Sequence, residues 1–141
     1  MLNSMLARTA VATAILALTH CTNAFAQQPP TGPGPGSLHY FNTLLENDPS
    51  REVRLQQQSY QPGPGTPYHT HPGDQWEAVL EGELTYMVRG QPPRVLKTGE
   101  SVYIPRGTVH RNENQSGKPA RTIELLIVDK DKPQRVDAPA E

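Results

Sequence analysis

The sequence has little of what marks several common classes of protein. It contains one cysteine in 141 residues, which excludes a disulfide framework within a single chain. Its 13 basic and 14 acidic residues nearly balance, so no cationic surplus exists to neutralise the phosphates of a nucleic acid. The apolar run Thr9–Leu18 is too short to cross a bilayer as a helix. The length fits one ordinary domain.

The first residues have the three-part layout of a secretory signal peptide. Met1–Arg8 carries a positive charge, an apolar run follows, and small residues end at Ala26. We predict cleavage after Ala26 and a periplasmic or secreted protein that has no membrane anchor after cleavage. Two alternatives are a buried amphipathic helix and a lipoprotein signal at Leu18–Cys21, where His20 stands in place of a small residue.

The remaining chain reads as a linker, a β-domain and a tail. Residues 27–37 are rich in proline and glycine and offer no core-forming side chain, which predicts a disordered linker. Residues 38–130 show apolar alternation broken by turn residues about every ten positions, which is typical of an antiparallel β-sandwich or barrel. Residues 131–141 are predicted to be a C-terminal tail. The alternating apolar residues are Val53 and Leu55; Leu84, Tyr86 and Val88; Val102 and Ile104; and Ile123, Leu125 and Ile127.

Histidines of the β-domain follow a spacing that suits a metal ion. His69 and His71 are two residues apart, so on a strand both side chains point to the same face. A Pro-Gly turn follows, after which Gln75 begins a strand and can point back at the same ion. His110 lies about forty residues on and would come from a neighbouring strand. The His-x-His pair alone also fits two surface histidines, so it decides little without its surroundings.

The surroundings of the first pair form a longer pattern. It reads Gly63-x5-His69-x-His71-x3-Gln75-x6-Gly82. This pattern resembles the first motif of the cupin family, with one departure: the family usually has glutamate where this chain has Gln75.

A second pattern follows at a short distance. It reads Gly99-x5-Pro105-x-Gly107-x2-His110-x3-Asn114 and is similar to the second cupin motif at each defining position. The two motifs and their flanking strands cover nearly all of residues 38–130. The resemblance implies an antiparallel jelly-roll barrel of the cupin, or double-stranded β-helix, type with a metal inside it.

The resemblance and the spacing together give a ligand set. We predict that His69, His71, Gln75 and His110 hold a divalent transition metal, which could be Fe, Mn, Ni, Cu or Zn. Because Gln75 brings no charge, the ion would be held less tightly and be more electrophilic than with glutamate. The ligand histidines must be neutral to bind, so acid should release the ion.

Glu77 is the candidate catalytic residue. It has the strand parity of Gln75 and lies about 6–7 Å further along the strand, so it should face the barrel interior. There it could act as a base over a substrate or hydrogen-bond a ligand histidine. The alternative is a structural carboxylate paired with Arg54, Arg89 or Arg121.

The remaining expectations concern the outside and the lining of the barrel. Trp76, Ala78 and Leu80 fall on the face opposite Gln75, and such an apolar outer face favours a homodimer, as is common among cupin relatives. His39 is expected at the surface, and Asn114 is expected to fix a turn. Four tyrosines are candidates to line the barrel: Tyr60, Tyr68, Tyr86 and Tyr103.

These observations favour an exported metal-dependent cupin of one domain that acts on a small organic molecule. In a dioxygenase, the metal would bind an enolate and O2 together while Glu77 takes the substrate proton. Two alternatives stay open: a cupin isomerase or decarboxylase, and a binding module that holds metal and ligand without turning the ligand over.

Overall fold

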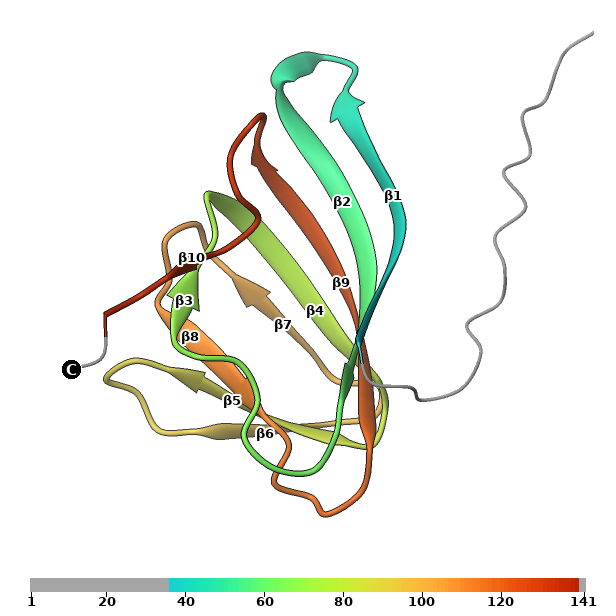
Figure 1. Cartoon of the computed structure of the whole chain (residues 1–141), viewed down its shortest axis with the longest axis vertical. Helices are drawn as coiled ribbons and strands as arrows, with labels where there is room; N and C mark the ends of the chain where they lie inside the picture. Colours follow the sequence, from blue (N-terminus) through green and yellow to red (C-terminus); the bar gives the residue numbers. More distant parts are fainter. Residues whose placement is uncertain (1–35, 140–141) are drawn as a thin grey trace, which may run out of the picture.

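The computed structural model describes residues 36–139, and within that range the chain forms strands and turns without a helix (Figure 1). Accordingly, the described residues offer no helix with the length and hydropathy to cross a membrane. The predicted signal peptide, 1–26, lies outside the described residues, as do 27–35 of the predicted linker. Gly36 and Ser37, at the end of that linker, already belong to the first strand, and strand β10 lies inside the predicted tail.

Ten strands form two five-stranded sheets. One sheet contains, in spatial order, β1 (Gly36–Leu45), β2 (Asp48–Tyr60), β9 (Ala120–Asp129), β4 (Gly73–Glu81) and β7 (Ser101–Ile104). The other contains β10 (Val136–Asp137), β3 (His69–Thr70), β8 (His110–Glu113), β5 (Glu83–Val88) and β6 (Arg94–Lys97). All strand pairs are antiparallel, which confirms the predicted all-β jelly roll. No ladder between described strands joins the two sheets, so the barrel is open.

The apolar core lies where β5 and β6 face β4 and β7. Leu84 and Leu96 are fully buried and Ile104 is nearly so, and they pack with Val79 and Tyr86. Each comes from an alternating strand, so its inward parity follows from the sequence. The apolar packing at this end closes the jelly roll, and beyond it the interior holds both apolar residues, such as Leu126 and Val128, and polar ones.

Strand β9 shows why the interior is not simply apolar. Its apolar residues Ile123 and Leu125 are half-buried on the outer face, whereas Thr122 and Glu124 are buried on the inner face. The register places Glu124 opposite Glu77 of β4. Apolar alternation therefore located this strand correctly, although the residues that alternate, Ile123 and Leu125 among them, lie on its outer face.

An apolar row runs across the outer face of the sheet that contains β1, β2, β9, β4 and β7. Register neighbours place Phe41, Leu55, Leu125, Trp76 and Tyr103 side by side on five successive strands. The rings of Trp76 and Tyr103 stack with centroids 5.2 Å apart, and their exposed fractions are 41% and 51%. We call these five residues the outer apolar row. The expectation that Tyr103 lines the barrel is wrong, because β7 turns it to this outer face.

A glycine allows the close packing of β4 on β9. A Cβ atom added to Gly73 would lie 2.0 Å from the carbonyl oxygen of Ile127, which no side chain tolerates. Gly73 precedes Gln75 by two residues, so this contact also sets the depth at which Gln75 enters the interior.

Candidate metal centre

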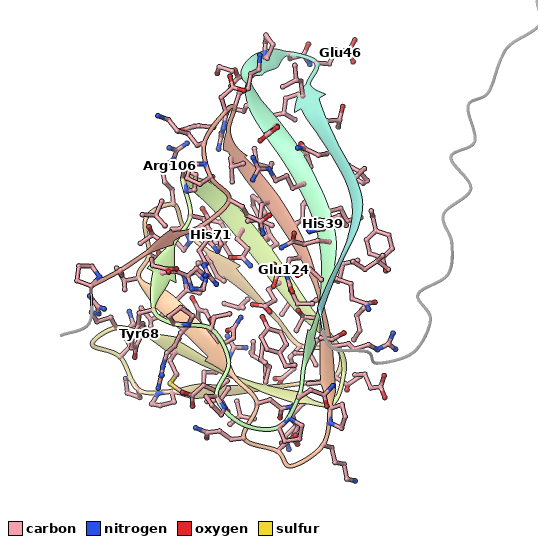
Figure 2. The ribbon with its side chains drawn as sticks, viewed as in Figure 1. His39, Glu46, Tyr68, His71, Arg106 and Glu124 are labelled. Carbon is pink, nitrogen blue, oxygen red and sulfur yellow. The ribbon has the colours of Figure 1, made fainter. Side chains whose placement is uncertain are left out.

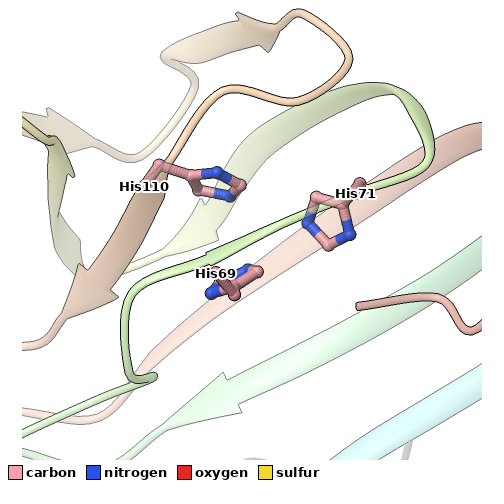
Figure 3. Close-up of side chains that lie close together, drawn as sticks. All are labelled: His69, His71 and His110. Atoms are coloured by element: carbon pink, nitrogen blue, oxygen red, sulfur yellow. The ribbon is translucent and has the colours of Figure 1, made fainter. Parts of the chain in front are cut away.

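Three histidines meet between the sheets (Figure 3). His69 begins β3, His110 begins β8, and the two are register partners. His71 follows β3 and shares the inward side of His69, as the two-residue spacing predicts. One ring nitrogen from each histidine lies within 4.8 Å of the others. Three nitrogens bound to one ion at 2.0–2.1 Å lie about 3–3.5 Å from one another, so the three rings would move inward by about an ångström to share an ion.

Backbone carbonyls orient all three imidazoles. The Nδ1 atoms of His69 and His110 lie 2.8 Å and 3.0 Å from the carbonyl oxygens of Pro67 and Thr108, each two residues earlier in the chain. The Nδ1 atom of His71 lies 2.6 Å from a carbonyl oxygen near the C-terminus. A donor hydrogen at Nδ1 leaves the Nε2 lone pair free, which is the tautomer that binds a metal.

Three of the buried polar atoms that have no hydrogen-bond partner belong to the predicted ligand set. Nε2 of His71, Nε2 of His110 and Oε1 of Gln75 are buried and have no hydrogen-bond partner. Buried polar atoms without partners are rare and costly. Three such atoms of the predicted ligand set fit a divalent ion, and the imidazole and amide donors suit a first-row transition metal.

Burial also keeps the ligands in their binding form. It lowers the pKa of His69, and it lowers the pKa values of His71 and His110 to about 4. All three imidazoles are therefore neutral at neutral pH, as a metal requires. Gln75 is 2% exposed and sits near enough to His71 to affect its pKa.

An open cavity of about 570 Å³ leads to this centre. His69, His71 and Gln75 form part of its wall, and Glu124 contributes a carboxyl group. In Figure 2, His71 and Glu124 lie in the space between the sheets. The volume falls in the range of small-molecule sites. The surface residue His39 lies at the rim.

Two carboxyl groups face each other in the interior. Glu77 accepts hydrogen bonds from Nδ2 of Asn112 at 2.9 and 3.2 Å, and Glu124 accepts one from Nε2 of Gln56 at 2.7 Å. Burial raises the pKa of Glu77 to about 7, and burial together with the charge of Glu77 raises the pKa of Glu124 to about 8. The hydroxyl of Tyr60 lies between them, 3.5 Å from Glu124 and 3.3 Å from Nδ2 of Asn112.

Glu77 thus lies inside the barrel, as predicted, and its catalytic role stays a prediction. Its hydrogen bonds are to neutral groups, while Arg54 pairs with Glu52 and Arg121 with Glu81. Glu77 is also absent from the cavity wall, whereas Glu124 forms part of it.

Glu124 and Tyr60 are the polar groups of the site that motif reasoning did not single out as chemistry. Glu124 sits in an apolar stretch outside both motifs, and its inward direction depends on which face of β9 is buried. The signal available was parity: the residues flanking it, Ile123 and Leu125, share the opposite face.

The structure also shows where the predicted turn residue and two of the predicted lining tyrosines lie. Asn114 fixes a turn, because its Nδ2 donates to the carbonyls of Tyr60 and Lys118 and its Oδ1 accepts from Ser116. Tyr86 is buried in the core, with its ring 5.7 Å from that of His110. Tyr68 does not line the cavity.

Known proteins resemble the chain over this same region. TcmJ of Streptomyces glaucescens, a tetracenomycin polyketide synthase protein, is 36% identical over 63 residues, which are 44% of this chain and 42% of that protein. The dimethylsulfoniopropionate lyase DddQ of Ruegeria pomeroyi is 39% identical over 44 residues, 31% of this chain and 22% of the lyase. The chain spans half or less of the length of the curated relatives it matches.

Solved structures agree on the fold. An RmlC-like cupin of Methanocaldococcus jannaschii with a double-stranded β-helix fold superposes with a TM-score of 0.61 at 16% identity, over 73% of this chain and 88% of that one. The crystal structure of DddQ gives a TM-score of 0.58 at 24% identity, over 72% and 51% of the two chains. The family model of the cupin domain matches residues 56–128, which contain all four predicted ligands, and the chain belongs to the cupin family.

Proposed function

We propose that this cupin is a metal-dependent enzyme that acts on a small organic molecule in the cavity. The observation that carries the proposal is the set of buried, unpartnered ligand atoms of His71, His110 and Gln75, two of which belong to residues of the cavity wall, His71 and Gln75. Orienting carbonyls hold the imidazoles in the metal-binding tautomer before any ion arrives. The ion would be Fe, Mn, Ni, Cu or Zn, all of which accept imidazole with an oxygen ligand.

The more specific proposal is a dioxygenase. A redox-active ion at the three histidines and Gln75 would supply a place for an enolate and O2 together. The protein would supply proton transfer: Glu124 reaches the cavity and Glu77 lies opposite it on the neighbouring strand. Their pKa values of about 8 and about 7 suit groups that take up and return a proton near neutral pH.

A lyase, isomerase or decarboxylase is the second candidate. The paired carboxyl groups favour it, because proton abstraction and return require no O2. DddQ is named as a lyase, which adds support of the same kind. A metal-binding module without turnover would need the same ligands but would not need Glu124 to be in the cavity wall.

Metal analysis followed by an O2-uptake screen separates these functions. The protein would be produced with its first 26 residues in a bacterial periplasm, and its metal content measured by elemental analysis. Iron, copper or nickel with O2 uptake on small phenols or enols supports the dioxygenase. A redox-inert metal with turnover and no O2 uptake supports the second candidate, and one equivalent of metal without turnover on any compound supports the binding module.

We also propose that the protein is exported and forms a homodimer. Export rests on the signal-like layout of residues 1–26, and a mature N-terminus at Gln27 in periplasmic extracts would support it. Dimerisation rests on the outer apolar row, which extends across five strands and exposes two stacked aromatic rings.

A further inference from the structure

The C-terminal segment 133–139 crosses the molecule next to the metal centre. Its strand β10 pairs with β3, so that Asp137 is the register partner of His69. One residue further, the backbone N–H of Ala138 donates to the carbonyl of Tyr68 at 2.8 Å. We call residues 133–139 the C-terminal strap. In Figure 1 it lies across β3 at the edge of its sheet.

The strap orients one ligand from outside the motifs. His69 and His110 are held by carbonyls two residues before them, so their orientation is local to their own turns. His71 is held by the carbonyl of Gln134, 63 residues away, at 2.6 Å from Nδ1. The tautomer and direction of this one imidazole therefore depend on a contact from the strap, whereas those of His69 and His110 depend on carbonyls within their own turns.

The strap also places a cation in the cavity wall. Arg135 is the single lysine or arginine among the described residues that line the cavity. Its Nε bonds the carboxylate of Asp137 at 3.0 Å, and its side chain is 41% exposed. Arg135 shares the cavity wall with His69 and His71, so its positive charge lies on the same cavity as the metal centre. The terminal nitrogens of a guanidinium form a fork that matches a carboxylate.

We propose that the C-terminal strap is a working part of the metal centre: the Gln134 carbonyl positions His71 for the ion, and the Arg135 guanidinium receives an anionic group, such as a carboxylate, of a molecule bound at that ion. This inference rests on the proposed metal site and adds a substrate class to it. A ligand with one anionic end would then lie with that end at the mouth and its reacting part toward Gln75 and Glu124.

The first experiment measures metal affinity in two strap variants. One variant ends at Lys130, and its matched control ends at Pro139. The other is Ala138→Pro, which removes the hydrogen bond to Tyr68, and its matched control is Gln134→Ala, which keeps the carbonyl that His71 uses. Each variant and each control protein is titrated with Co²⁺, and the visible absorption spectrum and the pH dependence of Co²⁺ binding are recorded.

We expect the strap variants to bind Co²⁺ about 10–100-fold more weakly than their controls, the range found when a group that orients a ligand histidine is lost. The Co²⁺ spectrum should change as His71 leaves the ion. Unchanged affinity and spectrum in both Lys130-terminated and Ala138→Pro proteins overturn the positioning role. Absence of Co²⁺ binding in the unaltered chain overturns the proposed function itself.

The second experiment tests Arg135 with acetate and its neutral analogue acetamide. Co²⁺-loaded protein is titrated with each probe in the variants Arg135→Gln, Arg135→Lys and Arg94→Gln, the last being an exposed arginine outside the cavity. We expect Arg135→Gln to weaken acetate binding about tenfold, as loss of a charge-assisted hydrogen bond does, and to leave acetamide unchanged. Arg135→Lys should keep part of the affinity. Equal acetate affinity in the Arg135→Gln and unaltered proteins overturns the anion site.

Discussion

The sheet that contains β4 and β9 has two different faces. Its inner face carries Gln75, Glu77 and Glu124, whereas its outer face carries Trp76 and Leu125. Gln75 is 2% exposed and its chain neighbour Trp76 is 41% exposed. Burying polar groups costs free energy unless they find partners, and exposing a large apolar row costs solubility. Both arrangements run against what folding alone would select. We infer that the inner face is kept for chemistry and the outer face for a protein partner.

The largest effect should follow from removing a predicted ligand histidine, which belongs to the other sheet and faces this inner side. His110→Ala deletes an imidazole whose Nε2 has no protein partner, so metal affinity should fall by more than about 100-fold, beyond the loss expected for an orienting contact. Elemental analysis after dialysis measures it, with His39→Ala as the control at the cavity rim. A full equivalent of metal in both His110→Ala and His69→Ala proteins would show that the ligand set is wrong.

A charge on the outer face should split the proposed dimer. Trp76→Asp puts a carboxylate in the outer apolar row between Leu125 and Tyr103, and the loss of an exposed aromatic contact should raise the dimer dissociation constant about 30-fold or more. Analytical ultracentrifugation reports the change. Metal content should stay at the unaltered level, since Trp76 faces away from Gln75. If the unaltered protein is a monomer at micromolar concentration, the proposed dimer through the outer apolar row is wrong.

The inner carboxyl groups should make the metal-free protein less stable as pH rises from about 6.5 to 8. In that window the folded state keeps protons on Glu77 and Glu124 that the unfolded state releases, because their folded pKa values are about 7 and about 8. The melting temperature should drop by about 5 °C or more. Below pH 6.5 the trend reverses, because the buried histidines resist protonation.

Glu124→Gln should reduce this pH slope, and the double variant with Glu77→Gln should flatten it. Glu46→Gln, at the exposed tip of the β1–β2 hairpin, is the control (Figure 2). Thermal melts followed by circular dichroism at four pH values are sufficient. The assignment fails if the double variant keeps the slope of the unaltered protein.

The smallest effect should come from adding charge to the inner face. Gln75→Glu introduces a carboxylate next to the ion, and the gained attraction should raise metal affinity by about tenfold. Competition with a chelator of known affinity measures it, and Gln75→Ala should move the affinity in the opposite direction. Equal affinities for the unaltered and Gln75→Glu proteins would mean that position 75 does not touch the ion.

The sequence predicted those parts of the molecule that depend on nearby residues. Strand parity placed His69 and His71 together, and the motif spacing added His110 and Gln75. Parity also turned Trp76 outward. Strand parity and motif spacing depend on a few neighbouring residues or on a fixed pattern of turns, so they can be predicted from the sequence without a structure.

The parts that depend on sheet pairing could not be predicted. Glu124 faces Glu77 only because β9 pairs with β4 in a particular register, and because β9 has apolar residues on both faces, its alternation did not say which face is the interior. The contact from Gln134 to His71 joins segments 63 residues apart and uses a carbonyl oxygen, which every residue has. The side chain at position 134 therefore gives no sign of this contact in the sequence.

The carbonyl contacts at Nδ1 have a consequence for how this centre can change over time. Because main-chain oxygens fix all three imidazoles, substitutions of neighbouring side chains leave those acceptors in place. A substitution at the predicted ligand position 75 would therefore change the charge at this centre while the carbonyl contacts of the three imidazoles stay in place.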